Sequence, residues 1–284
     1  MSIEIKNVTK RFGDTCALDN VTLTFGDDKI YGLLGNNGAG KTTLMSILTG
    51  RQNPTEGAVA IDGESIVNND SALGKVFLVA EQNMFPEDMK VCKALKTAEL
   101  FYPDFDRAYA ENLAKKFALN TKKKIKALST GYSSIFRLIL GLSVNTPYLI
   151  FDEPVLGLDA QHRDMFYRVL LEKYAERPCT VIVSTHLIAE AADLIEHAVI
   201  IRDGRILRDC PREELTAEAY AVSGPAGLVD KYLDGRHVLS TNVLGGLKTA
   251  CVQGKRGTLP EGLEFSAINL QDYFISLMEE EDRK

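Results

Sequence analysis

A single glycine-rich segment constrains this chain more than any other part of its sequence. Residues 35–42 read GNNGAGKT and fit the pattern G-x-x-x-x-G-K-[ST], between an apolar run at 30–34 and a helix-like segment at 41–49. In this context the glycines let backbone N–H groups converge on phosphate oxygens, and the helix N-terminus adds a favourable dipole. Lys41 can reach the outer phosphates of a nucleotide, and the Thr42 hydroxyl can bind Mg²⁺.

The segment therefore predicts a strand, a phosphate-binding loop and a helix that together hold a nucleotide. The alternative is a glycine-rich turn with a solvated lysine, but the strand–loop–helix context favours the nucleotide site. We assign nucleotide binding to the loop and the start of the helix, namely Asn36, Asn37, Gly38, Ala39, Gly40, Lys41, Thr42 and Thr43.

A second apolar run, at 148–151, ends in two adjacent acids, Asp152 and Glu153. A strand that ends beside the phosphate-binding loop would place Asp152 where it can hold hydrated Mg²⁺. Glu153 would then stand where it can polarise an attacking water molecule. Taken alone, the pair could equally be a strand end at a turn, because apolar strands that end in two acids are common.

Five further segments give these two motifs a context. In chain order they are KRFG at 10–13, AEQN at 80–83, LSTGY at 128–132, LGLD at 156–159 and STH at 184–186. With the two motifs above, they resemble the ordered motifs of the nucleotide-binding subunit of an ABC (ATP-binding cassette) transporter. The resemblance covers residues 1–210.

The resemblance implies that the chain binds ATP with Mg²⁺ and hydrolyses it between two cassettes. Phe12 would stack on adenine, unless it belongs to the core. His186 would contact the γ-phosphate, unless it caps the following helix. The Ser129 hydroxyl and the Gly131 backbone N–H would bind the γ-phosphate of ATP held by a partner subunit. The implied catalytic residues are Glu153, His186 and Gln82, and the implied metal ligands are Thr42, Gln82 and Asp152.

The segment at 128–132 departs from the family's LSGGQ signature. Thr130 and Tyr132 stand where the family has Gly and Gln. The basic residue that the family usually carries three positions after the signature is missing, because Ile135 stands there and Arg137 comes two residues later. The signature serine and glycine are kept. We therefore expect the departures to affect the ATPase rate and the choice of partner rather than to remove catalysis.

The residue patterns and the resemblance together predict an α/β fold. It comprises a P-loop NTPase (RecA-like) core, an N-terminal antiparallel β subdomain, an inserted helical subdomain at about 84–145 and a small C-terminal α/β appendage. We expect the cassette to span 1–210 and an accessory domain to span 211–284. In that domain an amphipathic helix should begin at Leu270, with Asn269 as its cap and 279–282 as a frayed tail.

Charge and hydropathy set limits on the partners of the chain. It has 33 Lys and Arg against 39 Asp and Glu, a net charge of −6, which disfavours nucleic acid as a partner. No apolar run approaches the roughly 18 residues of a membrane span. The resemblance therefore implies a separate polytopic transmembrane permease subunit, with this chain in the cytoplasm on the inner face of the cell membrane. The second ATP-binding subunit could be a second copy or a different chain.

The short helical segment and the extra C-terminal residues resemble the ATPases of ABC-2 type exporters. These include Gram-positive bacteriocin, drug-resistance and phenol-soluble modulin systems, so the resemblance implies export of a peptide or an amphipathic drug. The alternative is a soluble ABC ATPase without a pore that acts as an assembly scaffold or regulator. Apolar residues near Gln82 could receive a coupling helix of the membrane subunit or form the core of the helical subdomain, namely Met84, Phe85, Phe101, Tyr102 and Phe105.

Overall fold

The computed structural model describes residues 1–26, 28–258 and 260–283. By the contacts between its residues, the chain divides into two compact units. The first contains Met1–His186 and Val199–Asp209, and the second contains Leu187–Ala198 and Cys210–Lys284. Residues 259 and 284, which belong to the expected accessory domain, lie outside the described residues.

The first unit begins with an antiparallel sheet whose strands alternate between buried and exposed side chains. Its register pairs Ile3 with Phe25 and Ile5 with Leu23, so these buried side chains share one face. The strand order is β2-β1-β4-β5. This sheet confirms the predicted N-terminal antiparallel subdomain, and its strands are β1 (Ile3–Phe12), β2 (Thr15–Phe25), β4 (Glu56–Ile61) and β5 (Glu64–Ser65).

The second sheet of this unit forms the centre of its α/β core. Its order is β10-β9-β3-β8-β7-β6, and the central pairs β3–β8, β8–β7 and β7–β6 are parallel. The central strands are buried on both faces, as the continuous apolar runs predict. The strands are β3 (Ile30–Leu34), β6 (Val76–Val79), β7 (Tyr148–Asp152), β8 (Thr180–Thr185), β9 (His197–Arg202) and β10 (Arg205–Pro211).

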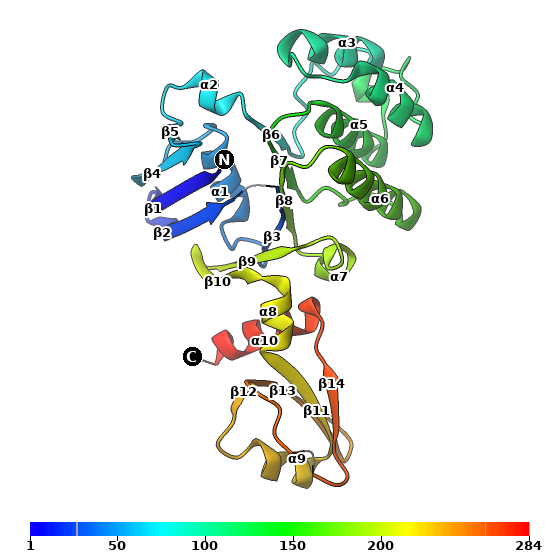
Figure 1. Cartoon of the computed structure of the whole chain (residues 1–284). Helices are drawn as coiled ribbons and strands as arrows, with labels where there is room; N and C mark the ends of the chain where they lie inside the picture. The colour runs from blue at the N-terminus through cyan, green and yellow to red at the C-terminus, as the bar shows by residue number, and fades with distance from the viewer. Residues whose placement is uncertain (27, 259, 284) are drawn as a thin grey trace. The chain divides into compact units, whose positions relative to one another are not determined.

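Helices surround this parallel sheet, and several begin at a capping side chain (Figure 1). The side chains of Asp106, Ser129 and Asp159 each accept a hydrogen bond from the backbone N–H three residues later. The helices of the unit are α1 (Lys41–Leu48), α2 (Asp70–Leu73), α3 (Val91–Phe101), α4 (Arg107–Lys116), the 3₁₀ helix η1 (Ile125–Ala127), α5 (Thr130–Ser143) and α6 (Ala160–Glu176).

The expected helical subdomain consists of α3, α4 and α5. Helix α5 contacts both of the other helices and also strand β6, so it joins the helical part to the parallel sheet. At that contact Gly141 is required, because an added Cβ would lie 2.3 Å from a methyl group of Val79. The segment LSTGY, at 128–132, lies at the N-terminal end of α5, and the helix is packed against the sheet further along, at Gly141.

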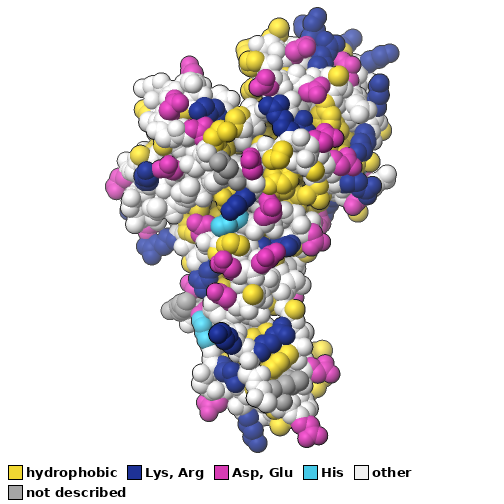
Figure 2. Space-filling view, in the orientation of Figure 1, with side chains coloured by type: hydrophobic (Ala, Val, Ile, Leu, Met, Phe, Trp, Pro, Cys, Tyr) yellow, Lys and Arg dark blue, Asp and Glu magenta, His cyan; other side chains and the backbone are white. Residues whose placement is uncertain are grey.

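The surface of the helical subdomain is basic and partly apolar. Lys and Arg side chains gather over α3 and α4 (Figure 2). Lys124 and Lys126 both form ion pairs with Asp88, at 3.1 and 2.7 Å. Among the apolar residues near Gln82, Phe105 belongs to the core, whereas Met84 and Phe101 are exposed.

The second unit is built on a four-stranded antiparallel sheet in the order β12-β13-β11-β14. Strand β13 lies between β11 and β12, so β11, α9 and β12 form a split βαβ unit. One face carries an apolar core with Tyr220, Val222 and Val252, against which α9 packs. The strands are β11 (Ala219–Pro225), β12 (His237–Leu244), β13 (Leu247–Gln253) and β14 (Glu264–Ala267), and the helices are α7 (Ile188–Ala191), α8 (Arg212–Ala217), α9 (Ala226–Leu233) and α10 (Leu270–Asp282).

Helix α10 confirms the predicted amphipathic helix at the C-terminus. It begins after Asn269, whose side chain accepts a hydrogen bond from the Asp272 N–H at 2.8 Å. The frayed tail expected at 279–282 is wrong, because these residues form the last turn of α10. Glu280 in this turn is held by the His237 Nε2 at 2.7 Å. Across the described parts of the chain, every helix is too short or too polar to span a membrane.

Candidate active site

The candidate site lies where the carboxyl ends of three neighbouring parallel strands meet. Strands β3, β8 and β7 are adjacent, so the residues that follow or end them come together at one edge of the sheet. The glycine-rich loop follows β3, Asp152 is the last residue of β7, and His186 follows β8. The sheet order thus explains how segments that are far apart in the sequence build one site.

The loop between β3 and α1 has a shape that requires glycine at its two ends. Gly40 has φ = 107°, a left-handed conformation, and an added Cβ would lie 2.7 Å from the Ala17 carbonyl oxygen. At Gly35 a Cβ would come within 2.4 Å of the Ile201 carbonyl oxygen. Between them, residues 36–38 are exposed and Ala39 is buried. The backbone therefore curls over the N-terminus of α1 and leaves the cradle open to a phosphate group.

Lys41 is buried although it carries a charge, with 6% of its side chain exposed. Its Nζ donates to the carbonyl oxygens of Gly35 at 2.6 Å and Asn36 at 3.2 Å, across the glycine-rich loop. Burial lowers the pKa of Lys41, and the nearby carboxylates of Glu153 and Asp152 oppose that effect. The ammonium group is therefore held in place at the base of the loop, where a phosphate would complete its charge pairing.

Asp152 is tied to the other two parts of the site through hydroxyl groups. Thr42 Oγ1 donates to Asp152 Oδ2 at 3.1 Å, and Ser184 Oγ donates to Asp152 Oδ1 at 3.1 Å. Burial raises the pKa of Asp152, while these two hydrogen bonds act in the opposite direction. The Thr42 hydroxyl and the Asp152 carboxylate are oxygen donors of the kind that Mg²⁺ prefers, so the residues present fit this ion.

Glu153 stands in an unusual backbone conformation for a residue other than glycine, with φ = 48°. Its N–H donates to the Ser184 carbonyl oxygen at 2.9 Å, which fixes the turn at the end of β7. Its side chain faces two cations or potential cations: Oε1 lies 2.9 Å from His186 Nδ1 and 3.8 Å from Lys41 Nζ. The left-handed turn thus aims the Glu153 carboxylate into the site.

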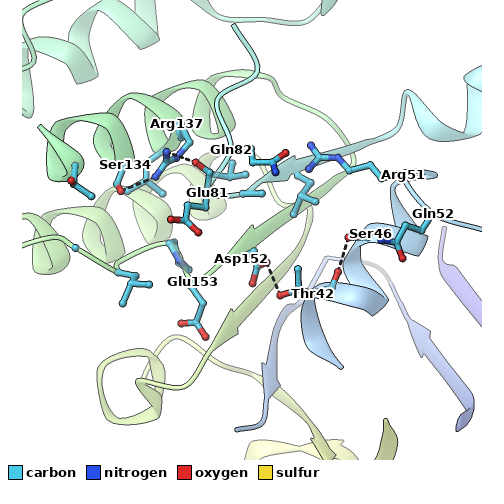
Figure 3. Close-up of a pocket in the computed structure, with 18 residues that line it drawn as sticks. Thr42, Ser46, Arg51, Gln52, Glu81, Gln82, Ser134, Arg137, Asp152 and Glu153 are labelled. Atoms are coloured by element: carbon cyan, nitrogen blue, oxygen red, sulfur yellow. Dashed lines mark hydrogen bonds between the residues drawn. The ribbon is translucent and has the colours of Figure 1, made fainter. Parts of the chain in front are cut away.

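Part of this cluster lines a cavity of about 560 Å³. Thr42, Asp152 and Glu153 form one side, and Gln82 reaches the same cavity from the segment after β6 (Figure 3). Gln52 also lines it, and its Oε1 is a buried acceptor with no hydrogen-bond partner in the described residues. The oxygen donors of Thr42, Asp152 and Glu153 on the wall of this cavity suit a hydrated cation with bound phosphate.

Phe12, Ser129 and Gly131 were also predicted for the site. In the described part of the chain they take no part in the hydrogen bonds and ion pairs that surround Lys41. Phe12 ends β1 with 47% of its side chain exposed, and Lys10 Nζ lies 5.0 Å from its ring centroid. Ser129 is exposed, and its Oγ accepts a hydrogen bond from the Tyr132 N–H at 3.4 Å. An added Cβ at Gly131 would lie 3.2 Å from the Gly157 carbonyl oxygen.

Sequence reasoning gave no role to two residues that the structure places in the site. Ser184 donates to Asp152, and its position next to Asp152 in the parallel register could have been inferred only once β7 and β8 were known to be neighbours. Arg137 lines the cavity from α5. The sequence showed it as a displaced basic residue, but the direction of its side chain depends on how α5 packs.

Comparison with known proteins identifies the family. The model of the ABC transporter family matches residues 18–156. The Nod factor export ATP-binding protein I of Burkholderia lata is 31% identical over 235 residues, which cover 78% of this chain and 77% of that protein. The chain belongs to the ABC transporter ATP-binding proteins.

Other members of the family agree with this assignment. This ABC ATPase is 28% identical to the bacitracin transport ATP-binding protein BcrA of Bacillus licheniformis. The match extends over 216 residues and covers 75% of this chain and 71% of that protein. The chain is also similar to the dimeric structure of MJ0796, a bacterial ABC transporter cassette, with 26% identity and a TM-score of 0.66. That match covers 74% of this chain and 98% of MJ0796.

The family assignment confirms the predicted α/β P-loop NTPase fold and the predicted activity. The chain is an ATPase cassette of an ABC transporter, and ATP is its nucleotide. The cluster of Lys41, Asp152, Glu153 and His186 is therefore the candidate centre for ATP hydrolysis.

Proposed function

We propose that this ABC ATPase powers an exporter, with ATP held between two cassettes that drive a separate transmembrane subunit. One observation carries the proposal. Lys41, Thr42, Asp152, Glu153 and His186 are gathered around one cavity or joined by direct contacts, whereas Ser129 faces outward at the N-terminal end of α5. Half of an ATP site is thus assembled within the chain, and a further phosphate-binding group is presented to a second subunit.

Within the chain's own half of the site we assign each side chain a role. Residues 36–43 bind the phosphates, with Lys41 on the outer ones, and Phe12 stacks on the adenine ring through its exposed face. Thr42, Asp152 and Gln82 hold Mg²⁺, which when bound neutralises part of the phosphate charge.

Glu153 is the residue that polarises the attacking water. Its carboxylate lines the cavity, and His186 Nδ1 and Lys41 Nζ both approach its Oε1, at 2.9 and 3.8 Å. His186 contacts the γ-phosphate and orients Glu153, and Gln82 completes the group from the opposite side of the cavity. The arrangement keeps the base fixed before substrate enters, so little reorganisation is needed at the moment of reaction.

The second half of each site comes from a second ATP-binding subunit, either another copy of this chain or a different cassette. The chain has one glycine-rich loop and one signature, and Ser129 and Gly131 would meet the γ-phosphate held by the partner. The similarity to MJ0796, whose structure is dimeric, supports this arrangement. The net charge of −6 supports a partner other than nucleic acid.

We assign the transport direction and cargo from the relatives. One is named for Nod factor export and another for bacitracin transport, so an exported peptide or amphipathic drug is the substrate we propose. The cassette, 1–210, would then lie on the cytoplasmic face of the cell membrane and bind a polytopic permease, and residues 211–284 would form its accessory domain.

The test of the catalytic assignment is the substitution Glu153→Gln in the full chain. We expect the variant to bind MgATP, to lose at least about 99% of its hydrolysis and to accumulate as an ATP-bound dimer in size-exclusion chromatography. Glu172→Gln is the control, because Glu172 is exposed on α6 and pairs with Lys116. If Glu153→Gln hydrolyses ATP at the normal rate, Glu153 is not the base.

The test of the transport assignment is purification of the chain from its native cells. A detergent-dependent complex with a polytopic membrane protein is the expected result. A stable complex without any membrane protein would contradict the exporter and would favour the scaffold or regulator.

A further inference from the structure

Arg137 connects the signature helix to the segment that carries Gln82. From its place on α5, its Nη1 donates to the backbone carbonyl oxygen of Glu81 at 2.5 Å, and its Nη2 donates to Ser134 Oγ at 2.9 Å (Figure 3). A further contact joins Nη1 to Ser133 Oγ at 3.4 Å. The planar guanidinium therefore spans two elements at once, which a point charge such as an ammonium cannot do in the same way.

Two more contacts hold the same segment against α5. Ser133 Oγ donates to Asn83 Oδ1 at 3.4 Å, and the rings of Phe85 and Phe136 lie 6.3 Å apart between centroids. Gln82 stands between the two residues, 81 and 83, that are held. Its own side chain is exposed and lines the cavity of the active site.

The guanidinium of Arg137 donates its hydrogen bonds to neutral acceptors. In the described residues it forms hydrogen bonds with one backbone carbonyl and two hydroxyl groups and no ion pair within 4 Å. Its partial burial lowers the pKa of the guanidinium. The carboxylate of Glu81 opposes this effect by attraction. The direct contacts of the guanidinium are nevertheless with the backbone of Glu81 and with serine hydroxyls, so they act on the geometry of the segment.

We propose that Arg137 is a positioning residue that keeps Gln82 in the active-site cavity by holding the backbone at Glu81. The proposal rests on the assignment of Gln82 to the catalytic group. Because Arg137 stands on the helix whose N-terminus carries Ser129, it also makes Gln82 and the signature parts of one body.

This role belongs to Arg137 because of where it stands in the sequence. Ile135, in the position where the family usually has its basic residue, is buried in the core. Two residues later the helix has turned by roughly 200°, so the side chain of Arg137 emerges on a different side of α5, toward Glu81. The displaced basic residue is thus placed for a backbone contact at the segment 81–83.

The test is a double-mutant cycle on steady-state MgATP hydrolysis by the full chain. The variants are Gln82→Ala, Arg137→Met and the double variant, and Arg168→Met is the control because Arg168 is exposed on α6 and pairs with Asp164. Met keeps the length and much of the packing of the arginine stem but lacks its donors. We expect Arg137→Met to lower kcat by about tenfold or more with KM for ATP changed by less than about twofold.

The decisive comparison is the double variant. If Arg137 acts through Gln82, the double variant has the same kcat as Gln82→Ala, because no positioned amide is left to lose. A double variant whose loss is the product of the two single losses overturns the proposal. An Arg137→Met variant with wild-type kcat overturns it as well.

A third variant separates positioning from folding. Arg137→Lys keeps the charge and one reachable donor, and we expect it to recover part of the kcat while its melting temperature matches that of Arg137→Met. If kcat follows the melting temperature across the variants instead, Arg137 has a structural role only and the proposal fails. If the wild-type chain hydrolyses MgATP and Gln82→Ala does so at the same rate, the assignment of Gln82 fails instead.

Discussion

His186 holds Glu153 from two directions. Its Nδ1 lies 2.9 Å from Glu153 Oε1, and its backbone N–H donates to Glu153 Oε2 at 3.4 Å. The backbone contact survives any substitution at residue 186 other than proline, whereas the imidazole contact does not. The pair therefore offers a way to separate the placement of the carboxylate from the chemistry of the imidazole.

We predict that His186→Ala lowers kcat for ATP by about 100-fold and leaves ATP affinity nearly unchanged. The reason is that Glu153 loses the side-chain contact that orients it, while Lys41 and the glycine-rich loop still bind the phosphates. Steady-state kinetics together with equilibrium ATP binding check this prediction. His162→Ala serves as the control substitution for a partly exposed histidine that pairs with Asp159, and a kcat for His186→Ala as high as for that control contradicts the prediction.

The burial of Asp152 predicts a gain in stability when the site is disabled. Its pKa in the folded chain is raised by burial above the value of the unfolded chain. The folded state therefore holds this proton to higher pH than the unfolded state does, so the destabilisation is absent at low pH and grows as the pH rises through the folded pKa. Asp152→Asn should remove this part of the pH dependence.

We expect Asp152→Asn to raise the free energy of unfolding at pH 7 without nucleotide while abolishing MgATP hydrolysis. Urea unfolding across a pH series measures the effect, and the difference from wild type should vanish toward acidic pH. Asp164→Asn is the matched control because that aspartate is exposed on α6 and pairs with Arg168. If Asp152→Asn is less stable than wild type at pH 7, burial of the Asp152 carboxylate does not destabilise the folded chain.

Two glycines of the same loop should differ sharply in their tolerance of alanine. Both have positive φ, 107° at Gly40 and 82° at Gly38, but only Gly40 lacks space: its Cβ would lie 2.7 Å from the Ala17 carbonyl oxygen. At Gly38 a Cβ meets nothing within 4 Å. We predict a loss of about 1 kcal/mol for Gly38→Ala and about 3 kcal/mol or more for Gly40→Ala, measured by chemical unfolding. Equal losses would refute the steric argument.

Helix α10 offers a matched pair of substitutions in the second unit. Leu277 is fully buried in this helix, and Ile275 is 45% exposed two residues before it. Leu277→Ala should destabilise the unit by about 3 kcal/mol, because a cavity is left behind, whereas Ile275→Ala should cost less than about 1 kcal/mol. Hydrogen exchange of the amides in β12 and β13 reports the local effect. Similar exchange in both variants would show that α10 does not stabilise the sheet.

Much of the fold could be predicted because local sequence and fold agree in the cassette. The alternation of Ile3 and Ile5, the apolar run at 30–34 and the glycines that follow it all specify structure within a few residues. Asn269 likewise marks the start of α10, because its side chain caps the helix by accepting a hydrogen bond from the N–H of Asp272, three residues later. These features depend on periodicity and capping, which act over one or two turns of chain.

Features that depend on distant contacts could not be predicted. The run at 279–282 was expected to fray as a terminal segment, but it forms the last turn of α10, and His237, which is far away in the sequence, pairs with Glu280. In the candidate site, Asp152 and Glu153 were found from the sequence, yet the donation from Ser184 follows only from the strand order. The direction of Arg137 follows only from the packing of α5.

The wall behind the glycine-rich loop comes from a late part of the chain. Gly204 donates its N–H to the Ala39 carbonyl oxygen at 3.0 Å, and Gly35 packs against the backbone of Ile201. During synthesis the loop therefore leaves the ribosome long before the strands that brace it. A nascent chain that ends before β9 has every residue of the phosphate cradle but lacks its support, so ATP can begin to stabilise this cassette only after the hairpin at 203–204 has emerged.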